Sequence, residues 1–296
     1  MALTDNLLAY YRFDETSGTN VEDVHSDHDG TASRTNILNN AGGILGYKGV
    51  FSAGVADRVE IPNHADLRPT GNFSVQGWLK MSSSTTYHDL ANSCSQYTGT
   101  GPSGFRLGVN MDDAHDHKAG FMIGNGATGS PPFVWSTTSV DDDAWHYLVG
   151  TWDGTYMKLY IDGTQEGGDV SGINAAYQTS NFPTIGVFHY NTSSYVCYMN
   201  GSVDEVAYWG RAITSTEVTT LWNDGTGYNI LTPENPTINV SDSPTVTENV
   251  TAEAPAVNYN ISTFDSAVVT EDKTVTIVAP NILFVRVGQR EGVEIH

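Results

Sequence analysis

The most constraining feature of this 296-residue chain is the segment WHYLVGTWDGTYMKLYIDGT, from Trp145 to Thr164. Apolar residues alternate with other residues on both sides of Asp153-Gly154, a pair that tolerates the positive φ angles of a tight hairpin turn. The segment therefore predicts two antiparallel strands, each with one apolar row. Such a hairpin suits a catalytic cleft, a sugar-binding face or a plain sandwich wall, and the pattern alone leaves these alternatives open.

Short strands are predicted on both sides of the hairpin, because alternating apolar segments are separated by Gly, Asn, Asp and Ser. FSVQGWLKM at 73–81 alternates as a strand with one face on a core would. The other candidate strands are 7–13, 58–61, 105–110, 120–124, 184–188 and 201–210. One helix is predicted in TSTEVTTLWNDG, with Thr214 or Ser215 as its N-cap and Asp224-Gly225 as its end.

The sequence changes character at LTPENPTINV, where two prolines precede a Thr-, Val- and Glu-rich stretch. We therefore predict a large domain at 1–231 and a β-rich tail at 232–296. The tail carries a weak repeat, since DSPTVTENVT from Asp242 resembles DSAVVTEDKTVT from Asp265, 23 residues later. Strands with so little apolar content are expected to dock on a partner or to assemble as an oligomer.

Composition excludes several classes of function. The chain has 34 acidic and 13 basic residues, a formal net charge of −21, so it is expected not to bind nucleic acid. No segment is apolar for long enough to span a bilayer, and no membrane insertion is expected. The start, MALTDNLLAYYRFDE, has no signal-peptide pattern, which predicts either a mature form or release without a signal. Cys94 and Cys197 allow one disulfide or two buried thiols.

Four segments resemble, in order, the laminin-G-like branch of the concanavalin A-like lectin/glucanase superfamily. They are residues 7–31, residues 49–80, the hairpin, and GSVDEVAYWGRAITSTEVTTLWNDG at 201–225. The family's usual Phe-Asp-Gly appears here as Phe-Ser-Ala-Gly. The resemblance implies an all-β fold, a two-sheet antiparallel jelly-roll sandwich over about residues 7–229, with a small β-rich C-terminal module or arm.

The resemblance leaves the function open, because this fold carries lectins, hydrolases, adhesion modules and spacers. Glucanases of the superfamily use carboxylates spaced along one strand, so that they share a face. The nearest candidates here are Asp204 and Glu205, which are adjacent and so are expected to point to opposite faces of a strand. No third carboxylate follows at the required spacing. The chain is therefore expected not to be an enzyme.

Two clusters mix histidine with aspartate, EDVHSDHD at 22–29 and DDAHDH at 112–117. Such spacing is compatible with a transition metal, although both residues are common in loops. Calcium is the preferred expectation, as a structural ion, because the fold often carries it and oxygen ligands abound. The expected ligands are Asp14, Asp23 and Asp204; alternatively, Asp14 and Asp23 only form turns.

Sugar binding needs aromatic platforms beside polar groups that reach hydroxyls. Both are frequent in the middle of the chain, in TTYHDLANSCSQYTGTGPSGFRLGVN, near Trp135 and in FHYNTSSYVCY. The alternative is that many of these aromatic residues, Tyr195 and Tyr198 above all, belong to the sandwich core. The predicted carbohydrate-binding residues are Tyr87, His88, Tyr97, Arg106, Asn110, Trp135, His189 and Tyr190.

Three functions are compatible with these features. The preferred hypothesis is a structural protein of the virion surface, such as a phage decoration or fibre protein. It would present the lectin-like domain to a cell-surface glycan and dock, as a homo-oligomer, on a capsid or tail protein of the same particle through residues 233–296. The alternatives are a secreted bacterial carbohydrate-binding or adhesion module and a divergent glycoside hydrolase or lyase.

Overall fold

The computed structural model describes residues 2–68, 71–94, 101–127, 130–171, 173, 182–191 and 194–232, with the side chain of Asn191 left out. Contacts divide the chain into two units, 1–231 and 232–296, and the fold below is that of the first. The predicted tail, its repeat and Tyr97 lie outside the described residues.

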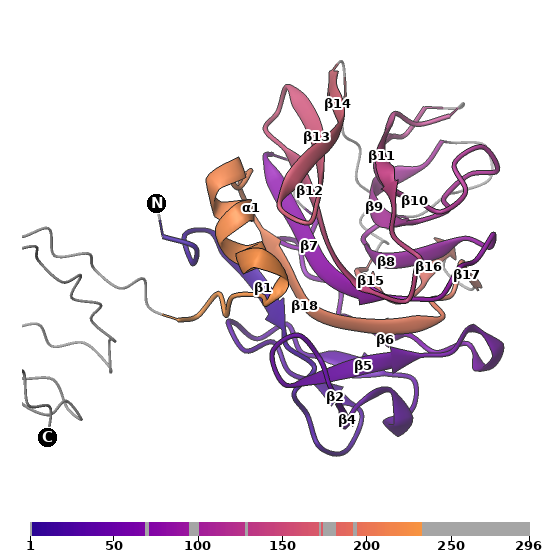
Figure 1. Cartoon of the computed structure of the whole chain (residues 1–296), viewed down its shortest axis with the longest axis vertical. Coiled ribbons are helices and arrows are strands. Elements are labelled where there is room, and N and C mark those ends of the chain that lie inside the picture. Colours follow the sequence, from indigo (N-terminus) through magenta and orange to yellow (C-terminus); the bar gives the residue numbers. More distant parts are fainter. Residues whose placement is uncertain are drawn as a thin grey trace, which may run out of the picture. The chain divides into compact units, whose positions relative to one another are not determined.

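Two antiparallel sheets form the domain (Figure 1). The strands of the first sheet are β1 (Leu7–Tyr11), β4 (Asn40–Ala41), β5 (Tyr47–Phe51), β7 (Phe73–Lys80), β12 (Trp145–Trp152), β13 (Tyr156–Ile161), β14 (Thr164–Ser171) and β18 (Gly201–Trp209). They are ordered β14-β13-β12-β7-β18-β5-β4, and β1 also pairs with β18. The predicted hairpin is β12 and β13, which pair from Leu148↔Ile161 to Trp152↔Met157.

The second sheet faces the first and has the order β11-β10-β9-β8-β15-β6-β3-β2. Its strands are β2 (Asn20–Val21), β3 (Gly30–Ala32), β6 (Val59–Glu60), β8 (His88–Asn92), β9 (Ser103–Val109), β10 (Lys118–Asn125), β11 (Phe133–Ser139) and β15 (Thr184–Ile185). A separate hairpin, β16 (Phe188–Asn191) and β17 (Ser194–Val196), lies beside β8 (Figure 1). The predicted all-β, two-sheet sandwich is confirmed.

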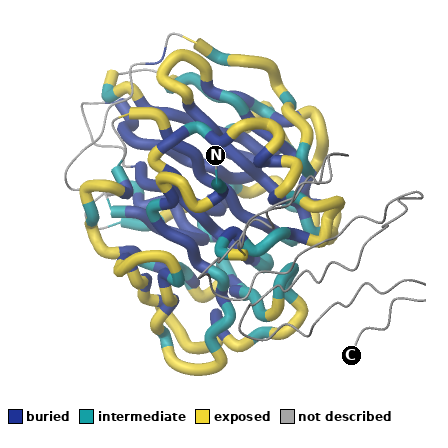
Figure 2. Tube along the Cα trace, turned by 90° about the vertical axis from the view of Figure 1, so that its left-hand side faces the viewer, coloured by how far each residue is buried: buried dark blue, intermediate teal, exposed yellow. Residues whose placement is uncertain are grey.

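The main hydrophobic core lies between the sheets. Figure 2 shows that the buried residues run along the strands, whereas the exposed ones gather in the loops. Phe73 and Leu148 of the first sheet and Phe105 and Phe121 of the second are at most 1% exposed. The ring centroid of Phe73 lies 5.0 Å from that of Phe105 and 6.0 Å from that of Phe121. Burial of each such side chain stabilises the fold by roughly 1.5–3 kcal/mol. The opening hairpin is therefore a wall of the sandwich.

The first sheet is buried on its outer face as well, which alternation alone did not predict. Trp78, Tyr147 and Trp209 form a second apolar layer there with Val218 and Leu221 of α1 (Ser215–Trp222). Strand β7 is consequently buried along nearly its whole length rather than on one face. The buried indole N–H of Trp209 has a partner in this layer, because it donates a hydrogen bond of 2.7 Å to the carbonyl oxygen of Leu3.

Helix α1 begins and ends close to where its sequence signals predict. Thr214 is the N-cap and forms a capping box with Glu217, while Asn223 ends the helix in the left-handed region with φ of 48°. Three single 3₁₀ turns complete the described elements: η1 (Thr35–Ile37), η2 (Ala53–Val55) and η3 (Asn223–Gly225). Within the described residues, no helix is long and apolar enough to cross a membrane.

Gly150, in the middle of β12, allows the two sheets to approach closely. A Cβ atom at this position would lie 2.4 Å from the ring of Phe121, which is fully buried. Gly150→Ala is expected to lower the free energy of unfolding by about 1–3 kcal/mol, as overpacking of a core does. Urea unfolding measures this loss. Gly54→Ala is the control, because its Cβ would meet no atom closer than 3.9 Å. Equal unfolding midpoints for the two variants would contradict the close contact between Gly150 and Phe121.

Candidate functional site

The outer face of the second sheet carries some of the predicted sugar-binding residues. Alternation along β9 buries Phe105, Leu107 and Val109 in the core, so Arg106 lies on the opposite face. Trp135, on β11, pairs with Gly120 and lies on this outer face as well, whereas His88, on β8, pairs with the core residue Val109 and lies on the inner face. His189 and Tyr190 are on β16, in a separate hairpin beside β8.

Trp135 is the centre of a stack of three half-exposed aromatic rings. The His115 ring lies 4.3 Å from the indole in a plane tilted by 3°, and the Phe133 ring lies 4.8 Å from it in a plane tilted by 11°. We call His115, Phe133 and Trp135 the Trp135 platform. Because each ring is held by its neighbour, the platform is a preorganised apolar surface with access to solvent.

Strands β10 and β11 explain why the platform forms. Phe133 and Trp135 are two residues apart on β11 and therefore point to the same side. Gly120 is the cross-strand partner of Trp135, and a Cβ atom there would lie 2.6 Å from the indole ring. The absent side chain lets the indole lie against the strand. A larger residue at this position would displace it.

The third ring of the platform comes from the loop between β9 and β10, which Asn110 anchors. Asn110 adopts a left-handed conformation with φ of 53°. Its side-chain amide donates hydrogen bonds to the carbonyl oxygens of Ser84 (2.6 Å) and Thr86 (3.2 Å), and its oxygen accepts one from the backbone N–H of His117. Asn110 is fully buried, so it positions the loop rather than offering its amide to a ligand.

Carboxylates form a polar rim beside the platform. The carboxylate of Asp112 contacts Nδ1 of His115 at 2.8 and 2.9 Å and so orients this ring. Asp113 accepts a hydrogen bond from the Tyr87 hydroxyl, which raises the pKa of Tyr87 to about 12 and keeps it protonated. The rim therefore combines acceptor oxygens with an aromatic surface. This combination suits a ligand that has both hydroxyl groups and C–H faces.

His88 supports the loop from below and is nearly inaccessible, with 2% of its surface exposed. Its Nδ1 lies 2.8 Å from the carbonyl oxygen of Tyr198, and its Nε2 lies 2.9 Å from the hydroxyls of Ser84 and Thr86. Burial lowers the pKa of His88 and favours the neutral imidazole. His88 was predicted to contact a sugar, but in the structure it holds the segment with Ser84 and Thr86 in place instead.

Arg106 is also removed from the solvent, which corrects its predicted role in sugar binding. Its guanidinium makes two hydrogen bonds with the carboxylate of Asp89, from Nε at 2.9 Å and from a terminal nitrogen at 2.6 Å. The Phe188 ring covers it, 4.1 Å from the guanidinium carbon. Arg106 is 8% exposed and Asp89 is 0% exposed, so the pair belongs to the interior of the domain.

The β16 residues extend the apolar surface away from the platform. Phe188 packs with Cys94 and Met122 on this face, and Tyr190 and Phe133 pack against the same cluster. His189 is 1% exposed, with its ring 4.1 Å from that of Phe182 and 5.0 Å from that of Tyr195. His189 is therefore buried, whereas Tyr190 stays half-exposed near the platform's apolar edge. Cys94 and Cys197, both at this cluster, are not joined by a disulfide.

A hollow opens elsewhere on the same sheet, where β3 and β6 pair. It measures ≈ 430 Å³ and is open to solvent. Its lining residues are Thr31, Glu60, Ile61, Pro62, Asn63 and Phe182. The hollow holds none of the predicted sugar-binding residues, so the Trp135 platform is the stronger candidate for that role.

The structure does not bring the three expected calcium ligands around one point. Asp23 accepts hydrogen bonds from the backbone N–H groups of Tyr10 and His25. Asp14 accepts one from the N–H of Tyr47 and pairs with Arg12 at 2.8 Å. N–H donors and a guanidinium thus occupy the oxygens that a calcium ion would need.

Asp204 is satisfied in the same manner, by the N–H groups of Ile44 at 2.7 Å and of Glu205 at 3.0 Å. Among the described residues, the group of His, Cys, Asp and Glu side chains with metal-ligand spacing contains none of the three aspartates. The residues therefore do not fit a calcium cage, and calcium stays a prediction without a site.

Asp204 and Glu205 were also the nearest match to glucanase carboxylates. A bulge in β18, with φ of 52° at Glu205, breaks the alternation expected of neighbouring strand residues. The two residues are 0% and 2% exposed, and Glu205 contacts the hydroxyl of Tyr10 on β1. Burial raises the pKa of Asp204 to about 7 and that of Glu205 to about 8. Neither carboxylate is accessible to a substrate in solvent.

Two members of the platform, His115 and Phe133, were not among the predicted residues. Phe133 and Trp135 alternate in PPFVWSTTS, a strand signal in a segment outside the predicted strands. His115 lies in DDAHDH, where the histidine–aspartate spacing suggested a metal. The structure instead pairs its two histidines separately, His115 with Asp112 and His117 with Asp141.

Comparison with known proteins gives one family and several distant structures. A family model described as the concanavalin A-like lectin/glucanases superfamily matches residues 53–219. Domain 4 of AbnA, a GH43 extracellular arabinanase from Geobacillus stearothermophilus solved in complex with arabinotriose, is 18% identical with a TM-score of 0.53. That match covers 73% of this chain and 97% of that domain.

Toxin binding domains give similar scores. The binding domain of Paraclostridial Mosquitocidal Protein 1 is 12% identical with a TM-score of 0.55, over 75% of this chain and 53% of that one. The binding domain of botulinum neurotoxin DC, in complex with SialylT, is 12% identical with a TM-score of 0.55, over 77% and 53%. The chain thus spans about half the length of these toxin domains, and such low identities show the shared fold alone. No curated protein sequence matches the chain.

Proposed function

The chain belongs to the concanavalin A-like lectin/glucanase superfamily, and we propose that it is a non-catalytic module that binds carbohydrate on the outer face of its second sheet. The observation that carries this proposal is the Trp135 platform with its carboxylate rim. The indole in the centre of the stack is covered by its two neighbours, so the apolar surface for the C–H face of a sugar is the free sides of His115 and Phe133 and the edges of the three rings. Carboxylate oxygens beside it accept hydrogen bonds from the sugar's hydroxyls.

The electrostatics of the rim favour a neutral oligosaccharide. Asp112, Asp113 and Asp116 are half-exposed or exposed in one short loop, and the chain as a whole has a net charge of −21. An anionic sugar would meet like charges on approach, which lowers both its rate of association and its affinity. The platform is an open surface rather than a closed pocket, which suits a stretch of a longer glycan.

The comparisons support carbohydrate binding as the class of function. The arabinanase domain was solved with arabinotriose and a botulinum neurotoxin binding domain with SialylT, both on this fold. We therefore propose a secreted or surface-displayed carbohydrate-binding or adhesion module. The virion-surface role, its docking partner and the homo-oligomer rest on residues 233–296, which the structure does not describe, and they stay predictions. The proposed absence of catalysis is supported by the burial of Asp204 and Glu205.

The proposal is tested by removing the central ring. Trp135→Ala is expected to weaken binding of neutral oligosaccharides by at least about 10-fold, because it removes the indole against which both other rings of the platform stack, and an aromatic contact contributes on the order of 1 kcal/mol beyond its buried area. The wild-type chain is first placed on a glycan array, and the strongest neutral ligand is then titrated calorimetrically into each variant. Thermal unfolding verifies that the variants are folded.

Tyr156→Ala is the matched control, because Tyr156 is an aromatic residue of β13 in the other sheet and is 42% exposed. It is expected to bind like the wild type. Two results would overturn the proposal: a wild-type chain that binds no glycan on the array, or equal affinities for Trp135→Ala and the wild type.

A further inference from the structure

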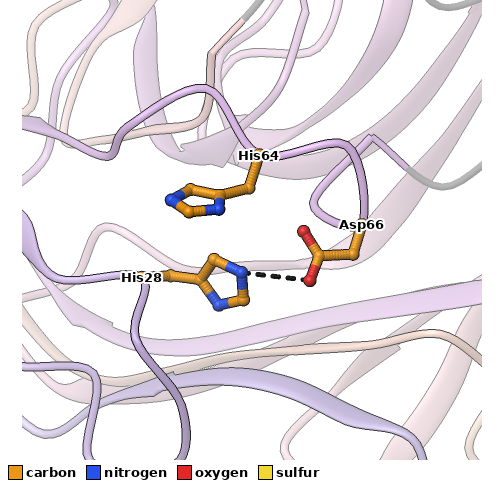
Figure 3. Close-up of side chains that lie close together, drawn as sticks. All are labelled: His28, His64 and Asp66. Carbon is orange, nitrogen blue, oxygen red and sulfur yellow. Dashed lines mark ion pairs between the residues drawn. The ribbon is translucent and has the colours of Figure 1, made fainter.

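A cluster of two histidines and one aspartate lies at the opposite end of the second sheet from the platform. His28 is in the loop between β2 and β3, whereas His64 and Asp66 follow β6. The pairing of β3 with β6, in which Thr31 faces Glu60, brings the two loops together. Figure 3 shows His28 beside His64 and directed at the Asp66 carboxylate.

The three side chains have the spacing of metal ligands. Their nearest nitrogen and oxygen atoms all lie within 4.8 Å of one another, and Nε2 of His28 is 3.0 Å from a carboxylate oxygen of Asp66. Ligands at the corners of a tetrahedral zinc site lie about 3.3 Å apart, given metal–ligand bonds of about 2.0 Å. Small rotations of these side chains would therefore place one ion between them.

The other ring nitrogen of His28, Nδ1, has the partners that a metal-binding histidine needs. Its Nδ1 lies 3.2 Å from the carboxylate of Asp23 and 2.6 Å from the hydroxyl of Ser26. Asp23 itself is held by the N–H of Tyr10 at 2.9 Å and is 4% exposed. A buried carboxylate on Nδ1 keeps the proton there and leaves the lone pair of Nε2 for a metal, as in carboxylate–histidine–zinc arrangements.

We propose that His28, His64 and Asp66 bind a divalent transition metal of the zinc class, with Asp23 as the positioning residue for His28. Two imidazoles and one carboxylate are ligands that Zn²⁺ accepts and that Ca²⁺ and Mg²⁺ do not prefer. Asp66 has 48% of its side chain exposed, so an ion can reach the cluster from solvent on this side. The ion would join the β2–β3 loop to the segment after β6.

The alternative is that His28 only bridges the carboxylates of Asp23 and Asp66, without any metal. The two explanations differ in what Zn²⁺ does. A metal site binds one equivalent of Zn²⁺ and the ion raises the melting temperature, since it binds the folded chain only. A bridging histidine gives no saturable binding.

Isothermal titration of the untagged, chelator-treated chain with ZnCl₂ tests the proposal. The wild type is expected to bind one equivalent of Zn²⁺. His64→Ala is expected to lose at least about 100-fold in affinity, because even outer partners of a metal ligand are worth 10–100-fold. Asp66→Asn is a second variant, in which one proposed ligand is replaced. Because 48% of the Asp66 side chain is exposed, this substitution is expected to leave the fold intact.

His25→Ala is the matched control, since His25 is exposed in the same loop as His28 but lies outside the cluster. It is expected to bind Zn²⁺ as the wild type does. CaCl₂ and MgCl₂ are expected to give no saturable heat. The proposal would be overturned if the wild type shows no single-site Zn²⁺ binding, or if His64→Ala and His25→Ala bind Zn²⁺ equally well.

Discussion

Replacing Arg106 with methionine is expected to lower the free energy of unfolding by about 3–5 kcal/mol, the usual cost of removing one partner of a buried ion pair. The variant leaves the carboxylate of Asp89 fully buried, with the side-chain amide of Asn92 at 3.2 Å as its remaining side-chain donor. Burial already raises the pKa of Asp89, and the charge of Arg106 opposes this rise. Methionine keeps much of the volume, so the loss reports on charge rather than on a cavity.

The double variant Asp89→Leu/Arg106→Met is the control for this expectation. Replacing a whole buried ion pair by apolar residues is often neutral or stabilising, so the double variant is expected to recover most of the loss. Urea unfolding of the wild type, both single variants and the double variant gives the coupling energy. If Arg106→Met lowered the free energy of unfolding by less than about 1 kcal/mol, the pair would behave as exposed ion pairs do, which would contradict its burial.

The fold could be predicted from the sequence because its signals are local. The hairpin has its turn residues and its alternation within 20 residues, and α1 has its capping box within four. The outer layer over β7 could not be predicted in this way. Its members, Trp78, Tyr147, Trp209 and Leu221, come from distant segments, and alternation does not report which element covers the second face of a strand.

The candidate site was predictable only in part, for the same reason. An arginine among aromatic residues indicated a ligand contact, yet the register of β8 and β9 sets Arg106 opposite Asn92 and within reach of Asp89. No local signal in the sequence fixes that register. His28 and His64 are likewise brought together by the pairing of β3 with β6. The histidine–aspartate cluster at 22–29 therefore indicated only His28 of the three proposed metal ligands.

Glu205→Gln is expected to make the protein more stable than the wild type at pH 8 while leaving the two nearly equal at pH 5. Burial, followed by the neighbouring charge of Asp204, raises the pKa of Glu205 from 4.5 to about 8. Between these two values the folded chain holds a proton that the unfolded chain has released. Rising pH therefore lowers the free energy of unfolding through this group, and glutamine, which does not titrate, removes that slope.

The difference between variant and wild type is expected to grow by about 2–4 kcal/mol from pH 5 to pH 8, since each unit of pKa shift corresponds to about 1.4 kcal/mol. Urea unfolding at three pH values measures it. Glu22→Gln, at an exposed glutamate of a loop, is the control and is expected to give a curve parallel to the wild type. A parallel curve for Glu205→Gln would mean that Glu205 is ionised at little cost in the fold. Water would then reach its carboxylate, and the argument against catalysis at β18 would lose its basis in burial.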